Sequence, residues 1–157
     1  MPEGRLRVVD RLQPPLEQDL RAEAGDFLLK RRDGAYAYQL AVVVDDAWSG
    51  VTDVVRGADL WTQTPRQRAL QEALGLPAPR YLHLPLVVEP DGRKLSKSDR
   101  ALALDPRRAG EALAWALGSL GLAPPADLQG AGGPALLQWA VQHWDPLAGG
   151  RLPVPAP

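Results

Sequence analysis

The stretch that decides the fold reads VTDVVRG at 51–57, TPRQRALQEAL at 64–74 and YLHLPLVV at 81–88. The first and third segments are rich in β-branched and large apolar residues and predict strands. The middle segment begins with Thr64 and Pro65, a typical helix start in which the threonine hydroxyl caps and proline takes the first helical position. A strand, a helix and a strand in this order are typical of an α/β domain.

Further elements are expected before this stretch: a strand at 6–10, a helical turn or a loop at 17–23, a strand at 26–30, a turn at Asp33-Gly34, and a segment at 38–48. The last segment admits two interpretations. Its valines favour a strand, whereas Leu40, Val43, Val44 and Ala47 follow the i, i+3, i+4, i+7 spacing of a helix. We favour the helix.

After the second strand the sequence predicts a loop, then helices, then a tail. Asp105 followed by Pro106 repeats the combination of a capping side chain and proline, and Gly121 ends the helix that starts there. A linker rich in proline and glycine follows at 123–134. A short helix at 135–144 completes the expected elements.

Composition and charge exclude several classes of protein. The chain has 157 residues, a formal net charge of −1, and hydrophobic and charged fractions of 45% and 24%, as in ordinary globular domains. It contains no cysteine, which excludes disulfides, thiolate metal sites and a cysteine nucleophile within it. The net charge near zero argues against bulk electrostatic binding of nucleic acid, and no apolar run is long enough to span a membrane. We therefore expect a cytoplasmic protein without membrane association, and we assign no metal ligand.

Lysine is rare in this chain, and two of the three lysines stand together. Lys94 and Lys97 lie in the run KLSKS at 94–98, and the third lysine is Lys30. Two ammonium groups with neighbouring hydroxyls and backbone amides favour an anion site of the kind that binds phosphate. A solvated basic loop is the alternative interpretation.

Two further side chains are candidates for binding a ligand. Arg56 follows directly after the predicted strand at 51–55, at the end of a strand where open α/β sheets bind ligands, and its guanidinium can hold a carboxylate with two parallel hydrogen bonds. The alternative is a surface ion pair with Asp53 or Asp59. Tyr38 can place its hydroxyl on a ligand or lie in the core. His83, in the second predicted strand, is expected to be a structural residue with satisfied hydrogen bonds.

These pieces occur in an order that matches a known family. The matching motifs are VDRLQ at 9–13, DF at 26–27, YQLAVVVDD at 38–46, GVT at 50–52, VVRGADL at 54–60, TPRQ at 64–67, HLPL at 83–86 and KLSKS at 94–98. With them the chain resembles the glutamyl and glutaminyl class I aminoacyl-tRNA synthetases over the region 5–145. The run KLSKS alone is moderately specific, and VVRGADL and TPRQ upstream at fitting spacing make the match far more specific.

The resemblance implies an α/β fold: the second half of a class I synthetase Rossmann-type catalytic domain, followed by a short helical C-terminal region. It divides the chain into a catalytic part at 1–104 that includes the KLSKS loop, a helical appendage at 105–145 and a flexible tail at 146–157. The HIGH-like first signature motif and the cysteine-rich zinc site of the family would lie upstream of residue 1. We therefore expect a portion of a longer enzyme, inactive alone, with zinc in complete family members and no zinc ligands here.

The resemblance also implies roles for individual side chains. The KLSKS loop matches the second signature motif, whose ATP-binding residues here are Lys94, Leu95, Ser96, Lys97 and Ser98. Lys97, with Lys94 beside it, would be catalytic by stabilising the ATP phosphates while glutamate attacks the α-phosphate and pyrophosphate leaves. Magnesium is expected with ATP. Tyr38 and Arg56 match the tyrosine and arginine that contact glutamate in the family.

The C-terminal length selects a branch of the family. Fifty-nine residues follow Ser98, too few for the large anticodon-binding region of full-length glutamyl-tRNA synthetases. The resemblance therefore implies the branch that activates glutamate with ATP and transfers it to the queuosine base of tRNA(Asp). Its expected partners are glutamate, ATP and tRNA(Asp), and the expected oligomeric state is a monomer. The alternatives are a fragment of an ordinary glutamyl-tRNA synthetase and a non-catalytic half-domain that binds anions or RNA.

Overall fold

The computed structural model describes residues 4–88, 94, 105–130 and 132–145. The chain divides into two compact units, Met1–Leu84 and Pro85–Pro157, which are described one after the other. Residues 95–98 of the KLSKS loop and the expected tail at 146–157 lie outside the described residues. The division into a catalytic part, an appendage and a tail therefore stays a prediction.

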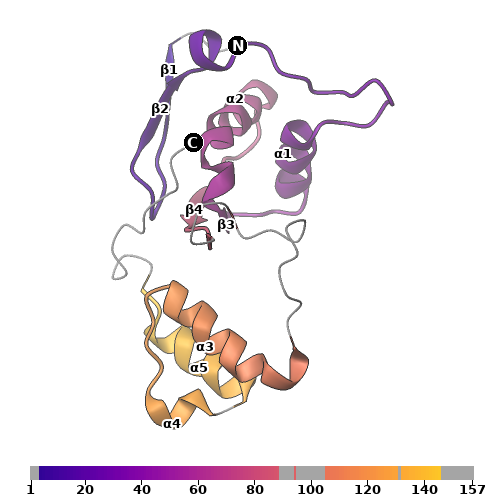
Figure 1. Ribbon diagram of the computed structural model, residues 1–157. Coiled ribbons are helices and arrows are strands. Elements are labelled where there is room, and N and C mark those ends of the chain that lie inside the picture. The colour runs from indigo at the N-terminus through magenta and orange to yellow at the C-terminus, as the bar shows by residue number, and fades with distance from the viewer. Residues whose placement is uncertain (1–3, 89–93, 95–104, 131, 146–157) are drawn as a thin grey trace. The chain divides into compact units, whose positions relative to one another are not determined.

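The first unit opens with an antiparallel pair of strands, β1 (Arg5–Val8) and β2 (Leu16–Asp19), shown in Figure 1. The strand expected at 6–10 is confirmed as β1. The helical turn or loop expected at 17–23 is wrong in its first half, which forms β2, and right in its second half, which is the π-helical turn η1 (Leu20–Ala24). Pairing with β1 outweighs the weak strand propensity of this segment, and an ion pair of 3.8 Å between Arg7 and Glu17 crosses the pair.

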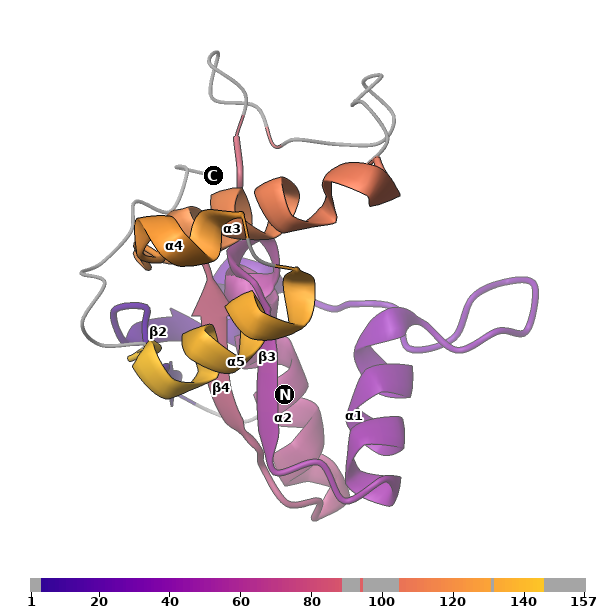
Figure 2. The ribbon, with the colours of Figure 1, turned by 90° about the horizontal axis from the view of Figure 1, so that it is seen from below.

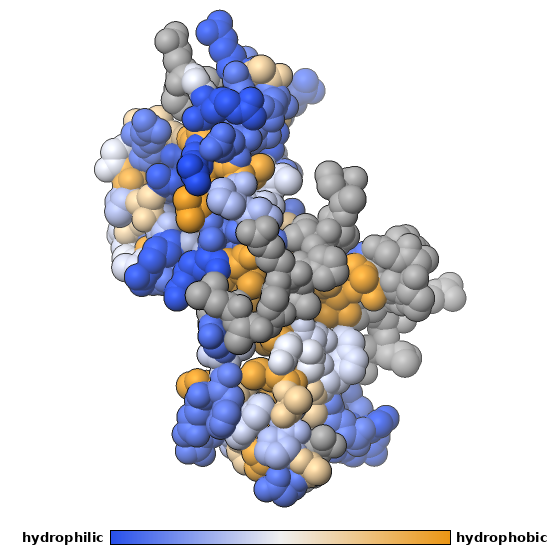
Figure 3. Space-filling model, turned by 90° about the vertical axis from the view of Figure 1, so that its left-hand side faces the viewer, coloured by the Kyte–Doolittle hydropathy of each residue, from blue (hydrophilic) through white to orange (hydrophobic). Residues whose placement is uncertain are grey.

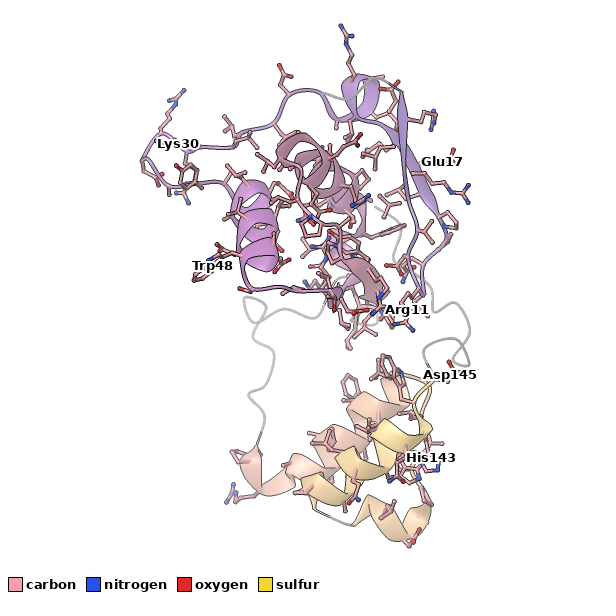
Figure 4. All side chains as sticks on the ribbon, turned by 180° about the vertical axis from the view of Figure 1, so that it is seen from behind. Arg11, Glu17, Lys30, Trp48, His143 and Asp145 are labelled. Atoms are coloured by element: carbon pink, nitrogen blue, oxygen red, sulfur yellow. The ribbon has the colours of Figure 1, made fainter. Side chains whose placement is uncertain are left out.

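The strand expected at 26–30 is wrong. These residues are irregular except for Lys30, which forms a single antiparallel bridge with Tyr36. A strand needs a neighbour to receive its backbone hydrogen bonds, and among the described segments none forms a ladder with this one. The turn at Asp33-Gly34 is confirmed, since Gly34 has a φ of +87°, a conformation that favours glycine. Figure 4 shows Lys30 at the outer end of this loop.

The centre of the first unit is the expected strand, helix and strand: β3 (Asp53–Gly57), the 3-10 helix η2 (Ala58–Gln63), α2 (Thr64–Leu74) and β4 (Arg80–Leu84). β3 and β4 pair in parallel and lie side by side in Figure 2. Their register sets Arg56 directly opposite His83. β4 is shorter than expected because Pro85, which has no N–H to donate to a ladder, follows its last residue.

The ambiguous segment at 38–48 is a helix, α1 (Tyr38–Trp48). Its helical spacing prevails over the strand propensity of its valines because α1 packs against α2 and buries Val43, which is 2% exposed. The last residue, Trp48, is 88% exposed and points outward in Figure 4. The expected helix is thereby confirmed.

Most of these elements contribute buried apolar residues. These residues are Val8, Leu20, Val43, Ala58, Trp61, Ala69, Leu70, Tyr81 and Leu82. The charged side chains of the β1–β2 hairpin lie at the surface, where Figure 3 shows hydrophilic and apolar residues intermixed. β3, which carries Arg56, is held by its parallel pairing with the buried strand β4.

The second unit consists of helices: η4 (Pro106–Arg108), α3 (Ala109–Ser119), α4 (Ala126–Gln129) and α5 (Gly133–His143). The expected cap is confirmed, because the Asp105 carboxylate accepts a hydrogen bond of 3.0 Å from the Arg107 N–H. The core holds Leu117, Leu136 and Ala140. The one-turn helix α4 lies inside the segment that was expected to be a linker. None of the helices in the described ranges has the length and apolar character needed to cross a membrane.

Candidate active site

Arg56 lies at the carboxyl end of β3 and is half-buried. Its Nε donates a hydrogen bond of 2.9 Å to Nε2 of His83, and its Nη2 donates one of 2.8 Å to Oγ1 of Thr64. The guanidinium carbon lies 5.2 Å from the centre of the Tyr81 ring, within the range of a cation–π interaction. Three neighbouring side chains therefore fix the position of this guanidinium.

His83 is completely buried and links Arg56 to the Asp10 carboxylate. Its Nδ1 lies 2.7 Å from Oδ2 of Asp10, and its backbone N–H lies 3.3 Å from Oδ1. A carboxylate oxygen only accepts, so Nδ1 carries the proton and donates it. Nε2 then holds the lone pair that accepts from Arg56. The imidazole stacks at 5.9 Å on Tyr81 and lies 5.0 Å from Trp61, which keeps its plane fixed.

Asp10 lies on a segment that runs along the other edge of β4. It forms a parallel bridge with Tyr81, and its Oδ1 accepts hydrogen bonds of 2.9 Å from the Leu12 N–H and 2.7 Å from the Gln13 N–H. Burial raises the pKa of this carboxyl, but the hydrogen bonds from His83 and the backbone outweigh burial, so the pKa lies below its ordinary value. Asp10 is therefore a buried carboxylate anion.

Thr64 does not cap α2 as the sequence predicts. The 3-10 helix η2 runs directly into α2, and Thr64 itself has helical angles. Its hydroxyl is buried, accepts from Arg56, and lies 3.2 Å from both the Leu60 carbonyl oxygen and Nε2 of His83. Because Nε2 already accepts from Arg56, the hydroxyl proton is directed to the Leu60 carbonyl.

The surface ion pair that the sequence allowed between Arg56 and Asp53 is wrong. The Asp53 carboxylate binds Arg80 instead, with hydrogen bonds of 2.7 Å and 2.6 Å. The positive charge of Arg56 also acts on Asp46 of α1. Burial and the neighbouring Asp45 raise the pKa of Asp46 and Arg56 lowers it, and the net effect is a raised pKa. In the described part of the chain no carboxylate forms an ion pair with Arg56.

The structure brings the other predicted site residues together only in part. Tyr38 lies at the first turn of α1 and is half-exposed, and among the described residues no hydrogen bond joins its hydroxyl to Arg56. Lys94 is exposed and forms a backbone bridge with Val88. Lys97, Leu95, Ser96 and Ser98 lie outside the described residues. In the ranges that the structure covers, no group of three or more histidine, aspartate or glutamate side chains is arranged to hold a metal ion.

Sequence reasoning missed the environment of Arg56. It placed His83 as a satisfied structural residue, which its complete burial and hydrogen bonds confirm, but it did not connect His83 to Arg56. The positions of the two residues could have indicated this contact. Arg56 and His83 are each the fourth residue of their strand, so they lie opposite each other once β3 and β4 pair in parallel. Asp10 lies 73 residues from His83, and no local pattern joins the two.

The region 11–111 matches the family described as tRNA synthetases class I (E and Q), catalytic domain. That region includes Arg56, His83 and Thr64. The chain belongs to this family. The predicted class I catalytic-domain fold is therefore confirmed, and the family is one of ligases.

Individual relatives are also named as synthetases. It is 56% identical over 153 residues to a protein of Ectopseudomonas mendocina named glutamyl-Q tRNA(Asp) synthetase, covering 98% of this chain and 51% of the relative. It is 57% identical over 145 residues to a protein of that name from Pseudomonas aeruginosa, covering 92% and 50%. The chain thus spans about half the length of these relatives.

A solved structure supports the same fold. The glutamate-tRNA synthetase of Elizabethkingia anophelis superposes with a TM-score of 0.54 at 30% identity, over 61% of this chain and 19% of that one. This chain thus shares its fold with a protein named as a glutamate-tRNA synthetase. The family match, the relatives and the solved structure confirm the resemblance to class I synthetases that the motifs predicted.

Proposed function

We propose that this chain is part of an enzyme that activates glutamate with ATP and transfers the glutamyl group to the queuosine base of tRNA(Asp). The family match and the identity of 56–57% to proteins named glutamyl-Q tRNA(Asp) synthetase support the proposal. The observation that carries it is the geometry of Arg56, a fixed guanidinium at a strand end with no carboxylate partner among the described residues.

Arg56 would hold a carboxylate of glutamate. A guanidinium has five N–H groups, of which two donate to described residues, so with respect to these residues three remain for a ligand. Glutamate has two carboxylates, and an oxygen of the α-carboxylate attacks the α-phosphorus of ATP. We assign Arg56 to the carboxylate on the glutamate side chain, to which Tyr38 would contribute a second hydrogen bond. This arrangement would select glutamate over glutamine, because an amide offers a single acceptor and no charge.

The KLSKS loop would act on ATP. Lys97 and Lys94 would stabilise the charge of the phosphates as the α-carboxylate of glutamate attacks and pyrophosphate leaves, and the other loop residues would contact the nucleotide. Family membership and the run KLSKS support these roles. Magnesium would accompany ATP as its counterion. The glutamyl adenylate would then pass its glutamyl group to queuosine, and we propose a cytoplasmic monomer that meets its tRNA there.

The test uses a chimera, in which this chain is joined to the part of the Pseudomonas aeruginosa relative that it does not match. We expect the chimera to load glutamate onto tRNA(Asp) that carries queuosine, and to leave unloaded both tRNA(Asp) without queuosine and tRNA(Glu). The 157-residue chain alone is expected to show no glutamate-dependent exchange of pyrophosphate into ATP.

An ordinary glutamyl-tRNA synthetase is the second candidate, because the solved structure of a glutamate-tRNA synthetase shares the fold. Loading of tRNA(Glu) alone by the chimera would replace the first candidate with this one. Robust exchange by the isolated chain would instead show that the remaining part is not required for glutamate activation.

A further inference from the structure

We propose that His83, Asp10 and Thr64 are positioning residues, which hold Arg56 in the orientation that receives glutamate without neutralising its charge. The inference rests on the proposed function, because it takes Arg56 as the group that binds the glutamate carboxylate. None of the three touches the substrate; each acts through the guanidinium.

The two hydrogen bonds of Arg56 fall on one edge of its guanidinium. Nε and Nη2 face the same side, and that side is occupied by His83 at 2.9 Å and Thr64 at 2.8 Å. Among the described residues none forms a hydrogen bond with Nη1, so with respect to them the edge formed by Nη1 and Nη2 is available for a ligand. A carboxylate can bind that edge with two parallel hydrogen bonds. The protein acceptors thereby decide which edge the ligand meets.

The acceptors that hold Arg56 are uncharged. An aspartate or glutamate in their place would form an ion pair with the guanidinium and compete with the carboxylate of the substrate. His83 accepts through Nε2 because its only ring proton is directed from Nδ1 to Asp10 at 2.7 Å. Asp10 therefore selects the tautomer of His83, because the hydrogen bond at one ring nitrogen decides which nitrogen carries the proton. The Asp10 carboxylate contacts His83, and His83 lies between it and Arg56.

The cluster is rigid on the side away from the ligand. Thr64, His83 and the Asp10 side chain are completely buried, and every polar atom that joins them has a partner. Arg56 itself is half-buried. The entropy of ordering a long side chain is thus lost during folding rather than during glutamate binding.

Two variants of His83 separate positioning from structural support. In His83→Asn the side-chain amide can donate to Asp10 from the place of Nδ1, but Nε of Arg56 loses its acceptor, while Nη2 keeps Thr64. In His83→Gln the longer side chain can accept from Nε of Arg56 near the place of Nε2, but the side-chain donor to Oδ2 of Asp10 is lost. His143→Asn is the matched control, because His143 is exposed on α5.

Positioning predicts opposite orders for stability and for glutamate binding. His83→Asn is expected to unfold at higher denaturant concentration than His83→Gln, since it keeps the buried Asp10 satisfied. In the chimera, His83→Asn is expected to raise the KM for glutamate about ten-fold or more, the loss of one hydrogen bond to a charged group, and His83→Gln to raise it less. The KM for ATP is expected to stay constant in both, and His143→Asn to match the parent.

A nuclear magnetic resonance measurement on the full 157-residue chain tests the geometry without activity. We expect a scalar coupling across the hydrogen bond between Nε of Arg56 and Nε2 of His83, with the His83 proton on Nδ1. Absence of the coupling, or a proton on Nε2, would overturn the inference. It would also be overturned if glutamate KM followed the order of stability, or if the KM for ATP rose equally.

The inference and the proposed function fail in different ways. If Arg56→Lys leaves the KM for glutamate unchanged, the glutamate-binding role of Arg56 is wrong and the inference falls with it. If Arg56→Lys raises that KM while both His83 variants behave as the parent, the proposed function stands and the positioning role is contradicted.

Discussion

Arg56 and His83 face each other across two parallel strands, with Nε of the arginine 2.9 Å from Nε2 of the histidine. The contact joins the carboxyl ends of β3 and β4, and it continues through His83 to the buried carboxylate of Asp10. A site side chain is thus fixed by strands that come from distant parts of the sequence.

Asp10→Asn is expected to destabilise the chain in a pH-dependent way. At neutral pH the loss is about 1–3 kcal/mol, since buried donors lose their anionic acceptor. The pKa of Asp10 in the folded chain lies below its ordinary value of 3.8. Its stabilising contribution is therefore complete above that value and is lost as the pH falls through the folded pKa.

The measurement for Asp10 is urea unfolding of both proteins at a series of pH values. The difference in unfolding free energy is expected to be constant from about pH 5 to 7 and to shrink below the ordinary value. A difference that grows on acidification would contradict the assigned direction of the pKa shift.

Gly75→Ala is expected to lower stability by about 1 kcal/mol, through backbone strain alone. Gly75 ends α2 with φ of +65°, and an added Cβ would meet nothing within 4 Å. Gly118→Ala is the opposite control, because Gly118 is helical in α3 with equal space and alanine favours the helix by about 1 kcal/mol. Denaturant unfolding should show opposite signs, and equal signs would be inconsistent with the left-handed conformation of Gly75.

Leu136→Ala is expected to destabilise the helical unit by about 2–5 kcal/mol, because it opens a cavity in the core. Leu136 is 0% exposed, whereas its neighbour Leu137 is 51% exposed. Leu137→Ala is therefore the matched control and should change stability little. Trp139 packs against this core, so its fluorescence reports the transition. Equal losses in both variants would mean that the core is placed on the wrong face of α5.

Lys97→Ala in the chimera is expected to lower kcat for glutamate-dependent pyrophosphate exchange by about 100-fold, as removal of a transition-state charge does. The KM for glutamate should change little. Lys94→Ala should have a smaller effect in the same direction. Lys30→Ala is the control, because Lys30 lies on the outer loop near the Tyr36 ring. Wild-type rates for Lys97→Ala would contradict the proposed role of Lys97 in glutamate activation.

The sequence predicted the elements whose signals are local. The spacing in α1, the strand at β3, the start and end of α2, and the turn at Gly34 all depend on neighbours within a few residues. The prediction failed where distant partners decide. β2 forms because β1 lies beside it. Residues 26–30 have no such strand beside them in the described part of the chain, and the Thr64 hydroxyl bonds to Arg56 and Leu60 in place of capping the helix.

The candidate site likewise combines a residue that the sequence could predict with partners that it could not. Arg56 could be found from its position at a strand end, and its role from the family motif. Its partners could not be found in this way. His83 lies 27 residues from Arg56 in the sequence, and Asp10 lies 73 residues from His83. Only the parallel register of β3 and β4, and the bridge along the outer edge of β4, bring them together.

The central claim is that Arg56 holds the side-chain carboxylate of glutamate. The most direct test measures glutamate-dependent pyrophosphate exchange by the chimera with Arg56 and with Arg56→Lys, at a range of glutamate concentrations. Lysine keeps the charge but loses the planar fork. We expect the KM for glutamate to rise about ten-fold or more, with the KM for ATP unchanged. An unchanged KM for glutamate in Arg56→Lys would contradict the claim.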